Sequence, residues 1–126
     1  MDKIDIRDLR VDDLVYSSFS KTPCKVTEIR LNESGYGVCK ITGVDGHKDV
    51  ASLSPIPLTE EILIQNGFPE DEWHGSFPED KNGLLYIVLS FNEIFWDFNG
   101  CRIELKSVHQ LQNLLRDLGI EKEIVL

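Results

Sequence analysis

The chain has 126 residues, of which 41% are hydrophobic and 28% charged, and its formal net charge is −9. This composition is typical of a folded globular chain, and the excess of acidic groups disfavours binding to phosphates or anionic lipid. The three cysteines include no C-x-x-C pair, which argues against a disulfide scaffold or a zinc module.

Residues 1–58 are expected to form short antiparallel strands. Residues 14–19 form a strand-like run, residues 24–32 alternate with a phase slip near Thr27–Glu28, and residues 36–44 alternate more regularly. The dipeptide Asp45-Gly46 predicts the turn of a hairpin, because both central turn positions tolerate positive φ. A small SH3-like barrel is the compact way to close such a set.

A helix over residues 60–66 follows this strand-rich part. Pro55 and Pro57 favour an extended entry. Thr59 suits the N-cap and Gly67 the C-terminal cap. The following stretch, residues 68–83, is rich in acids and is expected to be a loop with a short strand around Trp73.

A three-stranded antiparallel meander is predicted over residues 84–106. Residues 84–91 are nearly all apolar, as in a buried strand. The strand candidates 93–98 and 101–105 are separated by Asn99-Gly100, a strong hairpin signal.

The C-terminal part predicts an amphipathic helix. Ser107 and Gln110 have the spacing of a capping box, and Gly119 ends the helix. One apolar stripe runs along it, made up of Val108, Leu111, Leu114, Leu115 and Leu118. The last residues, 122–126, are expected to add a strand or a docking tail.

These elements define an α+β fold: an N-terminal small antiparallel SH3-like barrel, a short helix, a three-stranded antiparallel meander and a C-terminal amphipathic helix. We interpret residues 1–126 as a single α+β unit. A β-barrel-like lobe takes residues 1–58, and a helix–meander–helix lobe takes residues 59–126.

No catalytic constellation, cofactor motif or metal-ligand spacing stands out in the sequence. His74 lies among acids that would suit a divalent cation, but it has no calcium-loop pattern and no second histidine at helical spacing, so we expect a solvated loop. His109 has no orienting carboxylate placed by spacing, and we interpret it with Gln112 and Asn113 as a polar helix face. We therefore expect no enzyme activity, no cofactor and no metal.

Aromatic and acidic residues suggest a surface for binding another protein, because tryptophan is enriched in binding hot spots. The candidate partner-binding residues are Glu70, Asp71, Glu72, Trp73, Glu79, Asp80 and Trp96. A basic partner suits this charge. The N-terminus is charged from residue 2 and no apolar run is long enough to cross a membrane, so we expect a cytoplasmic protein.

Three segments resemble a family of small proteins that is common in Bacteroidota genomes, often in phage or prophage neighbourhoods. They are Asp8–Arg10, the Pro55–Thr59 helix entry with Gly67-Phe68, and the His109–Leu114 helix. Where the family's closing helix usually runs through an aromatic to Leu-Thr-Gly-Glu-Glu-Leu, this chain has Leu115 and Arg116 and no threonine before Gly119. The resemblance implies one folded unit and favours a phage–host role, and it supplies no activity or catalytic residues to carry over.

The function we infer first is a non-enzymatic protein-interaction module that acts on a host protein as an anti-defence or regulatory inhibitor. Two alternatives stay open. One is nucleic-acid binding through the N-terminal barrel, with Lys21, Lys25, Arg30, Lys40 and Lys48 as the contacting residues. The other is a small-ligand binder with a pocket between the lobes. The sequence does not indicate an oligomeric state.

Overall fold

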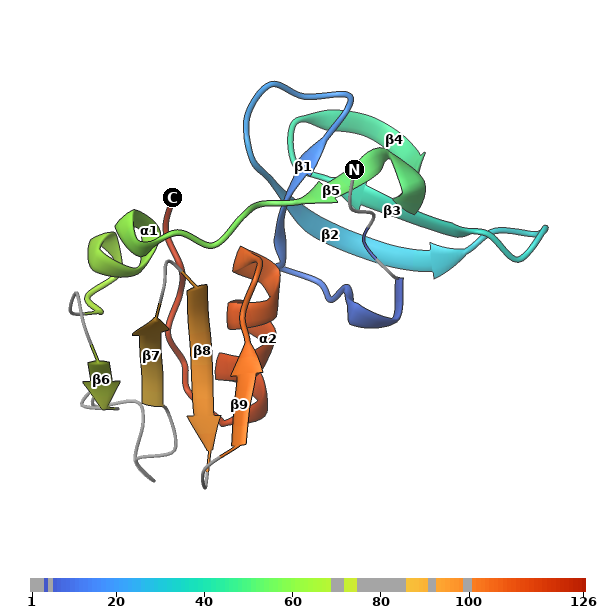
Figure 1. Ribbon diagram of the computed structural model, residues 1–126. Coiled ribbons are helices and arrows are strands. Elements are labelled where there is room, and N and C mark those ends of the chain that lie inside the picture. The colour runs from blue at the N-terminus through green and yellow to red at the C-terminus, as the bar shows by residue number, and fades with distance from the viewer. Residues whose placement is uncertain (1–3, 5, 69–71, 75–85, 91–92, 99–100) are drawn as a thin grey trace. The chain divides into compact units, whose positions relative to one another are not determined.

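A computed structural model describes residues 4, 6–68, 72–74, 86–90, 93–98 and 101–126. The chain forms two compact units, unit 1 over Met1–Ile56 and unit 2 over Pro57–Leu126. Both units contain antiparallel sheets, and the two α-helices lie in unit 2, which confirms the α+β class (Figure 1).

Unit 1 contains a five-stranded antiparallel sheet in the order β4-β3-β2-β1-β5. Its elements are η1 (Ile6–Asp8), β1 (Leu14–Ser17), β2 (Cys24–Leu31), β3 (Gly37–Ile41), β4 (Val44–Asp49), η2 (Val50–Ser52) and β5 (Leu53–Pro55). Because β4 and β5 stand at the two ends of this order, the sheet is not closed, and the predicted closed barrel is not observed among the described residues.

Strand β2 bends in the middle and serves both halves of the sheet. Its first residues pair with β1, and its remaining residues pair with β3, with a register shift between Val26 and Glu28. This shift confirms the phase slip that the sequence predicts at this point. A bulge adds a residue to one strand and bends it, so β2 can change neighbours along its length.

The hairpin turn between β3 and β4 differs from the prediction. Ile41 lies opposite Val44, so the turn is Thr42–Gly43, and Asp45-Gly46 lies within β4. Both Gly43 and Gly46 have positive φ, 78° and 77°. Gly43 therefore serves the two-residue turn, while Gly46 lies where the register of β4 shifts, and the sequence alone does not rank the two glycines.

The core of unit 1 is made from the inward side chains of this sheet and of the segment before it. Its buried members are Ile4, Leu9, Val15, Cys24, Val26, Cys39, Ile41, Val50 and Leu53. A buried carboxylate, Asp13, stabilises the turn that leads into β1, because its Oδ2 accepts a hydrogen bond of 2.8 Å from the Arg10 backbone N–H.

Unit 2 contains a four-stranded antiparallel sheet in the order β6-β7-β8-β9. Its elements are α1 (Glu60–Gln65), β6 (Glu72–His74), β7 (Tyr86–Ser90), β8 (Glu93–Phe98), β9 (Cys101–Glu104) and α2 (Val108–Asp117). The predicted meander corresponds to β7, β8 and β9, and the short strand expected around Trp73 adds β6 at the edge. The predicted Asn99-Gly100 turn lies outside the described residues.

Both helices begin at the caps that the sequence predicts. The Thr59 side chain accepts a hydrogen bond from the Ile62 N–H at the start of α1. At the start of α2, the side chains of Ser107 and Gln110 form a complete capping box. Gly67 and Gly119, which follow the two helices, have φ values of 92° and 73°, as expected for helix-ending glycines.

The segment after α2 forms no strand but is held against α1. Ile120 and Ile124 are buried. The Asn66 side chain accepts a hydrogen bond of 2.7 Å from the Val125 N–H and donates one of 2.9 Å to the Val125 carbonyl. One amide side chain thus satisfies both backbone groups of Val125, as a neighbouring strand would.

Candidate functional site

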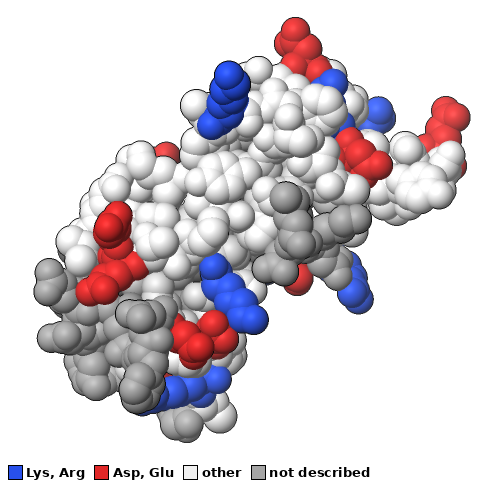
Figure 2. Space-filling view, turned by 45° about the horizontal axis from the view of Figure 1, so that its top comes forward, with Lys and Arg blue, Asp and Glu red and all other residues white. Residues whose placement is uncertain are grey.

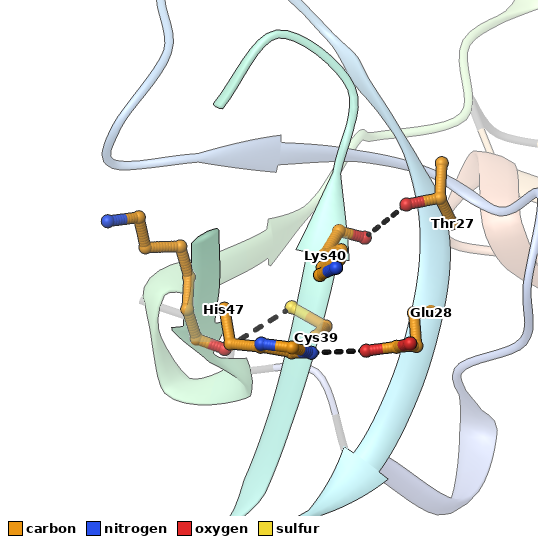
Figure 3. Close-up of polar contacts among 6 residues, drawn as sticks. Thr27, Glu28, Cys39, Lys40 and His47 are labelled. Atoms are coloured by element: carbon orange, nitrogen blue, oxygen red, sulfur yellow. Dashed lines mark hydrogen bonds and ion pairs between the residues drawn. The ribbon is translucent and has the colours of Figure 1, made fainter. Parts of the chain in front are cut away.

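A group of polar side chains lies across β2, β3 and β4 of unit 1 (Figure 3). His47 on β4 and Glu28 on β2 meet across the intervening strand β3, where His47 Nε2 pairs with a carboxylate oxygen of Glu28. The register that brings them together pairs Glu28 with Lys40. The sequence spacing of His47 and Glu28 did not indicate this pair. Their contact depends on the registers of β3 with β2 and with β4, and each of these pairings contains a register shift.

The hydrogen bond with His47 lowers the pKa of Glu28 below its usual value, and the nearby charges of Lys40 and Arg30 act in the same direction. Glu28 is therefore ionised at neutral pH. Its carboxylate is near two of the cations proposed for nucleic-acid binding, Arg30 and Lys40, where it would repel an approaching phosphate.

The remaining lysines of that proposed set do not join this group. Lys48 lies with its ammonium 4.6 Å from the centre of the Phe19 ring, in a cation–π contact. Lys25 is half-buried on β2, and Lys21 is exposed before that strand begins. On the face shown in Figure 2, acidic and basic side chains of the described residues are interspersed, and neither sign forms a broad patch.

Cys39 lies beside this polar group (Figure 3), and its environment disfavours the thiolate form. It is buried, and its Sγ lies 3.5 Å from the Lys48 carbonyl, to which it donates a hydrogen bond. Burial raises the pKa of the Cys39 thiol, and Asp49 raises it further. Because the thiolate is the nucleophilic form, a raised pKa opposes nucleophilic chemistry at this position.

The tip of the β2–β3 hairpin is the second notable feature of unit 1. We define the hairpin tip as residues 31–36. Leu31 and Tyr36, at its two ends, are 64% and 66% exposed. Figure 1 shows this hairpin extending beyond the rest of the five-stranded sheet. An open hollow of about 460 Å³ lies along residues 30–34.

The hairpin tip is ordered by one side chain. Asn32 Oδ1 accepts hydrogen bonds of 2.9 Å from the backbone N–H groups of Ser34 and Tyr36. The Asn32 N–H donates to the Tyr36 carbonyl, and Gly35 supplies the positive φ of 83° that the loop needs. The sequence does indicate a loop here, since Asn32 and Gly35 are turn-forming residues between the apolar Leu31 and Tyr36. It does not indicate that the side chains of Leu31 and Tyr36 stay exposed.

The partner-binding residues proposed from the sequence lie in unit 2. Glu70, Asp71, Glu79 and Asp80 lie outside the described residues. Glu72 and Trp73 belong to β6, and Trp96 is half-buried on β8. The strand registers place both Trp73 and Trp96 opposite the same residue, Ile87. The two tryptophan positions therefore flank Ile87, one on each side of β7.

The polar residues of α2 are less exposed than a solvated helix face. His109 and Gln112 are buried, and Asn113 is half-buried, with its Oδ1 accepting a hydrogen bond of 2.9 Å from Arg116. Val108, Leu111 and Leu115 are buried beside them. The helix is thus buried over a wider arc than its apolar stripe.

Within the described ranges, no cluster of three or more His, Cys, Asp or Glu side chains is arranged to hold a metal ion. The same ranges contain no helix with the length and apolar character needed to span a bilayer. Comparisons with protein-family models, curated proteins and solved structures give no match.

Proposed function

We propose that this protein is a non-enzymatic protein-interaction module that contacts its partner through the hairpin tip. The observation that carries this proposal is the exposure of Leu31 and Tyr36 on an ordered loop. A partner that covers large apolar side chains removes them from water, which favours binding, and tyrosine is one of the residues enriched in binding hot spots.

The order of the loop strengthens the proposal. A flexible loop loses conformational entropy when it binds, and a preorganised loop has already lost it. The three hydrogen bonds between Asn32 and the backbone of Ser34 and Tyr36 fix the loop before any partner arrives. Leu31 and Tyr36 are therefore presented at low entropic cost.

Charge indicates the kind of partner. Unit 1 has 8 basic and 9 acidic residues, so its net charge is −1, whereas unit 2 has 5 basic and 13 acidic residues and a net charge of −8. A field of this sign attracts a basic protein and accelerates its association. With the phage-associated resemblance of the sequence, we propose a basic host protein as the partner and the cytoplasm as the place of action.

The arrangement of unit 1 supports a partly open, SH3-like barrel as the scaffold of this hairpin. Strand β1 pairs with both β2 and β5, so the last strand of the unit returns to the first. The bend in β2 lets one strand belong to two halves of the sheet. Such a scaffold holds the β2–β3 hairpin by its base and leaves its tip free.

The test is a pull-down from host-cell lysate, at low and at high salt, analysed by mass spectrometry. The double variant Leu31→Ser, Tyr36→Ser removes the apolar surface of the tip. Val125→Ser is the matched control, because Val125 is a similarly exposed apolar residue in the other unit. The proposal expects a partner that wild type and control retain, that the double variant loses, and that high salt weakens. A partner retained equally by all three proteins would refute the role of the hairpin tip.

A further inference from the structure

The outer edge of β9 in unit 2 is open over a short stretch. Strand β9 is the last in its sheet, and none of the described residues pairs with its outer side between Cys101 and Glu104. Beyond that stretch the chain closes the edge itself: the Leu58 N–H donates a 2.9 Å hydrogen bond to the Lys106 carbonyl, and Pro57 bridges to Ser107. An open edge presents unpaired backbone groups to other strands.

The ladder between β8 and β9 shows which backbone groups face outward. The Leu105 N–H donates a 2.8 Å hydrogen bond to the Ile94 carbonyl, and the register pairs Phe95 with Glu104 and Trp96 with Ile103. Hydrogen-bonded and non-hydrogen-bonded pairs alternate along an antiparallel ladder. The backbone groups of Ile103 are therefore bonded to β8, and those of Arg102 and Glu104 point away from it.

The side chains along this edge are self-complementary. If two β9 strands align antiparallel about a two-fold axis at Ile103, each Arg102 lies opposite the Glu104 of the other copy. These are also the residues whose backbone groups face outward, so the same alignment pairs the N–H and C=O groups. Opposite charges directly across a strand pair stabilise it.

The apolar residues fit the same axis. Ile103 is 53% exposed and lies opposite the half-buried Trp96 on the same sheet. In the paired arrangement the two Ile103 side chains meet at the axis, each flanked by its own Trp96. This covers an apolar side chain that is otherwise left in water.

We propose that β9 is a homodimerisation edge, in which two copies of this chain pair their β9 strands antiparallel about Ile103 and join their four-stranded sheets. The contact is isologous, as is usual for two-fold dimers. Two strands of this length bury less surface than a standard interface of about 1,200–2,000 Å². The association is therefore weak and depends on protein concentration.

Charge reversal provides the first test, by sedimentation velocity over a concentration series that extends to the solubility limit. In the dimer, Arg102 of each copy faces position 104 of the other copy. Glu104→Arg and Arg102→Glu each place like charges at both of these contacts, and each is expected to weaken self-association about tenfold or more. Glu104→Arg is the cleaner variant, because Arg102 also lies 3.4 Å from Asp97 and that contact is then kept. An equimolar mixture of the two variants restores opposite charges at both pairs and is expected to recover the dimer.

Cross-linking provides the second test, on the full chain with Cys101→Ser to remove the exposed native thiol. Ile103→Cys places two cysteines at a non-hydrogen-bonded antiparallel pair, where Cα atoms are about 4.5 Å apart, within disulfide range. Lys106→Cys is the control, since Lys106 is exposed and lies outside the proposed pairs, so its two copies are far out of register. Preferential dimer formation by Ile103→Cys under mild oxidation supports the proposal. Three results would each overturn it. They are equal cross-linking of the two cysteine variants, an equimolar mixture of the two charge variants that stays monomeric, and a wild-type chain that is monomeric at all concentrations.

Discussion

Replacing Asn66 by alanine is expected to release the C-terminal segment from α1. The Asn66 side chain is buried and makes three short hydrogen bonds: two with the backbone of Val125, and one of 2.8 Å to the Ile62 carbonyl. A hydrogen bond of this kind contributes about 1 kcal/mol net, and the exposed flank of Val125 lets water replace part of the loss. We expect the free energy of unfolding of unit 2 to fall by about 2–3 kcal/mol.

Urea denaturation followed by tryptophan fluorescence measures this change. Both tryptophans of the chain, Trp73 and Trp96, lie in unit 2, so their fluorescence reports on that unit alone. With a urea dependence of about 1 kcal/mol per molar for a unit of this size, the midpoint is expected to fall by about 2–3 M. Hydrogen exchange of the Val125 amide in the wild type provides an independent readout, and its protection is expected to depend on Asn66.

The neighbouring residue gives a matched control. Gln65 is exposed, and its Nε2 reaches the Val125 carbonyl only at 3.4 Å, so Gln65→Ala is expected to cost less than about 0.5 kcal/mol. If Asn66→Ala costs no more than Gln65→Ala, or if the Val125 amide exchanges freely in the wild type, the side chain does not hold the C-terminal segment.

Three further changes test other parts of the structure. Ser107→Ala removes the N-cap of α2 and is expected to cost unit 2 about 1 kcal/mol by tryptophan fluorescence; an unchanged urea midpoint would contradict the capping role. The lowered pKa of Glu28 means that its pairing with His47 stabilises the fold above the usual glutamate pKa, and that this stabilisation is lost as pH falls through the lowered value. Because the hydrogen bond from His47 is the main cause, His47→Asn is expected to raise the pKa of Glu28 in an NMR titration. An unchanged Glu28 titration would exclude the pair. Gly37→Ala places a Cβ 2.5 Å from Ile6 Cδ1 and is expected to lower stability by about 1–3 kcal/mol in thermal unfolding by circular dichroism. Ile6→Val removes that Cδ1, so the double variant is expected to cost less than the sum of the single changes, and simple additivity would argue against the clash.

The local elements of this protein were predictable because their signals are short-range. Thr59 and the Ser107–Gln110 capping box begin their helices as the sequence predicts, since a cap depends on residues three positions apart. The phase slip near Thr27–Glu28 likewise predicted the irregularity of β2. These features need no knowledge of the rest of the fold.

Competing local signals were harder to resolve. The sequence predicts the β3–β4 turn at Asp45-Gly46, but the chain turns at Thr42–Gly43. Both glycines adopt positive φ, so both sites satisfy the local requirement. Only the pairing of β4 with β3 selects one of them.

The candidate sites depend on features that local patterns do not contain. The pairing of His47 with Glu28 arises from strands that flank β3, and the outward backbone groups of Arg102 and Glu104 follow from the phase of the β8–β9 ladder. His109 lies next to Gln110 on a helix whose apolar stripe places it on the polar side, yet it is buried. A periodic pattern indicates which face is apolar and not how wide an arc the neighbouring elements cover.

The sequence by itself determined the composition class, the caps of both helices, the strand-forming runs and the excess of acidic charge, because each depends on residue identity or on near neighbours along the chain. Only the tertiary structure decided which strands are edges, which apolar side chains stay exposed at Leu31, Tyr36 and Ile103, and which polar side chains are buried. The physical reason is that exposure and strand pairing are properties of residues distant in sequence, and they are set when those residues pack together.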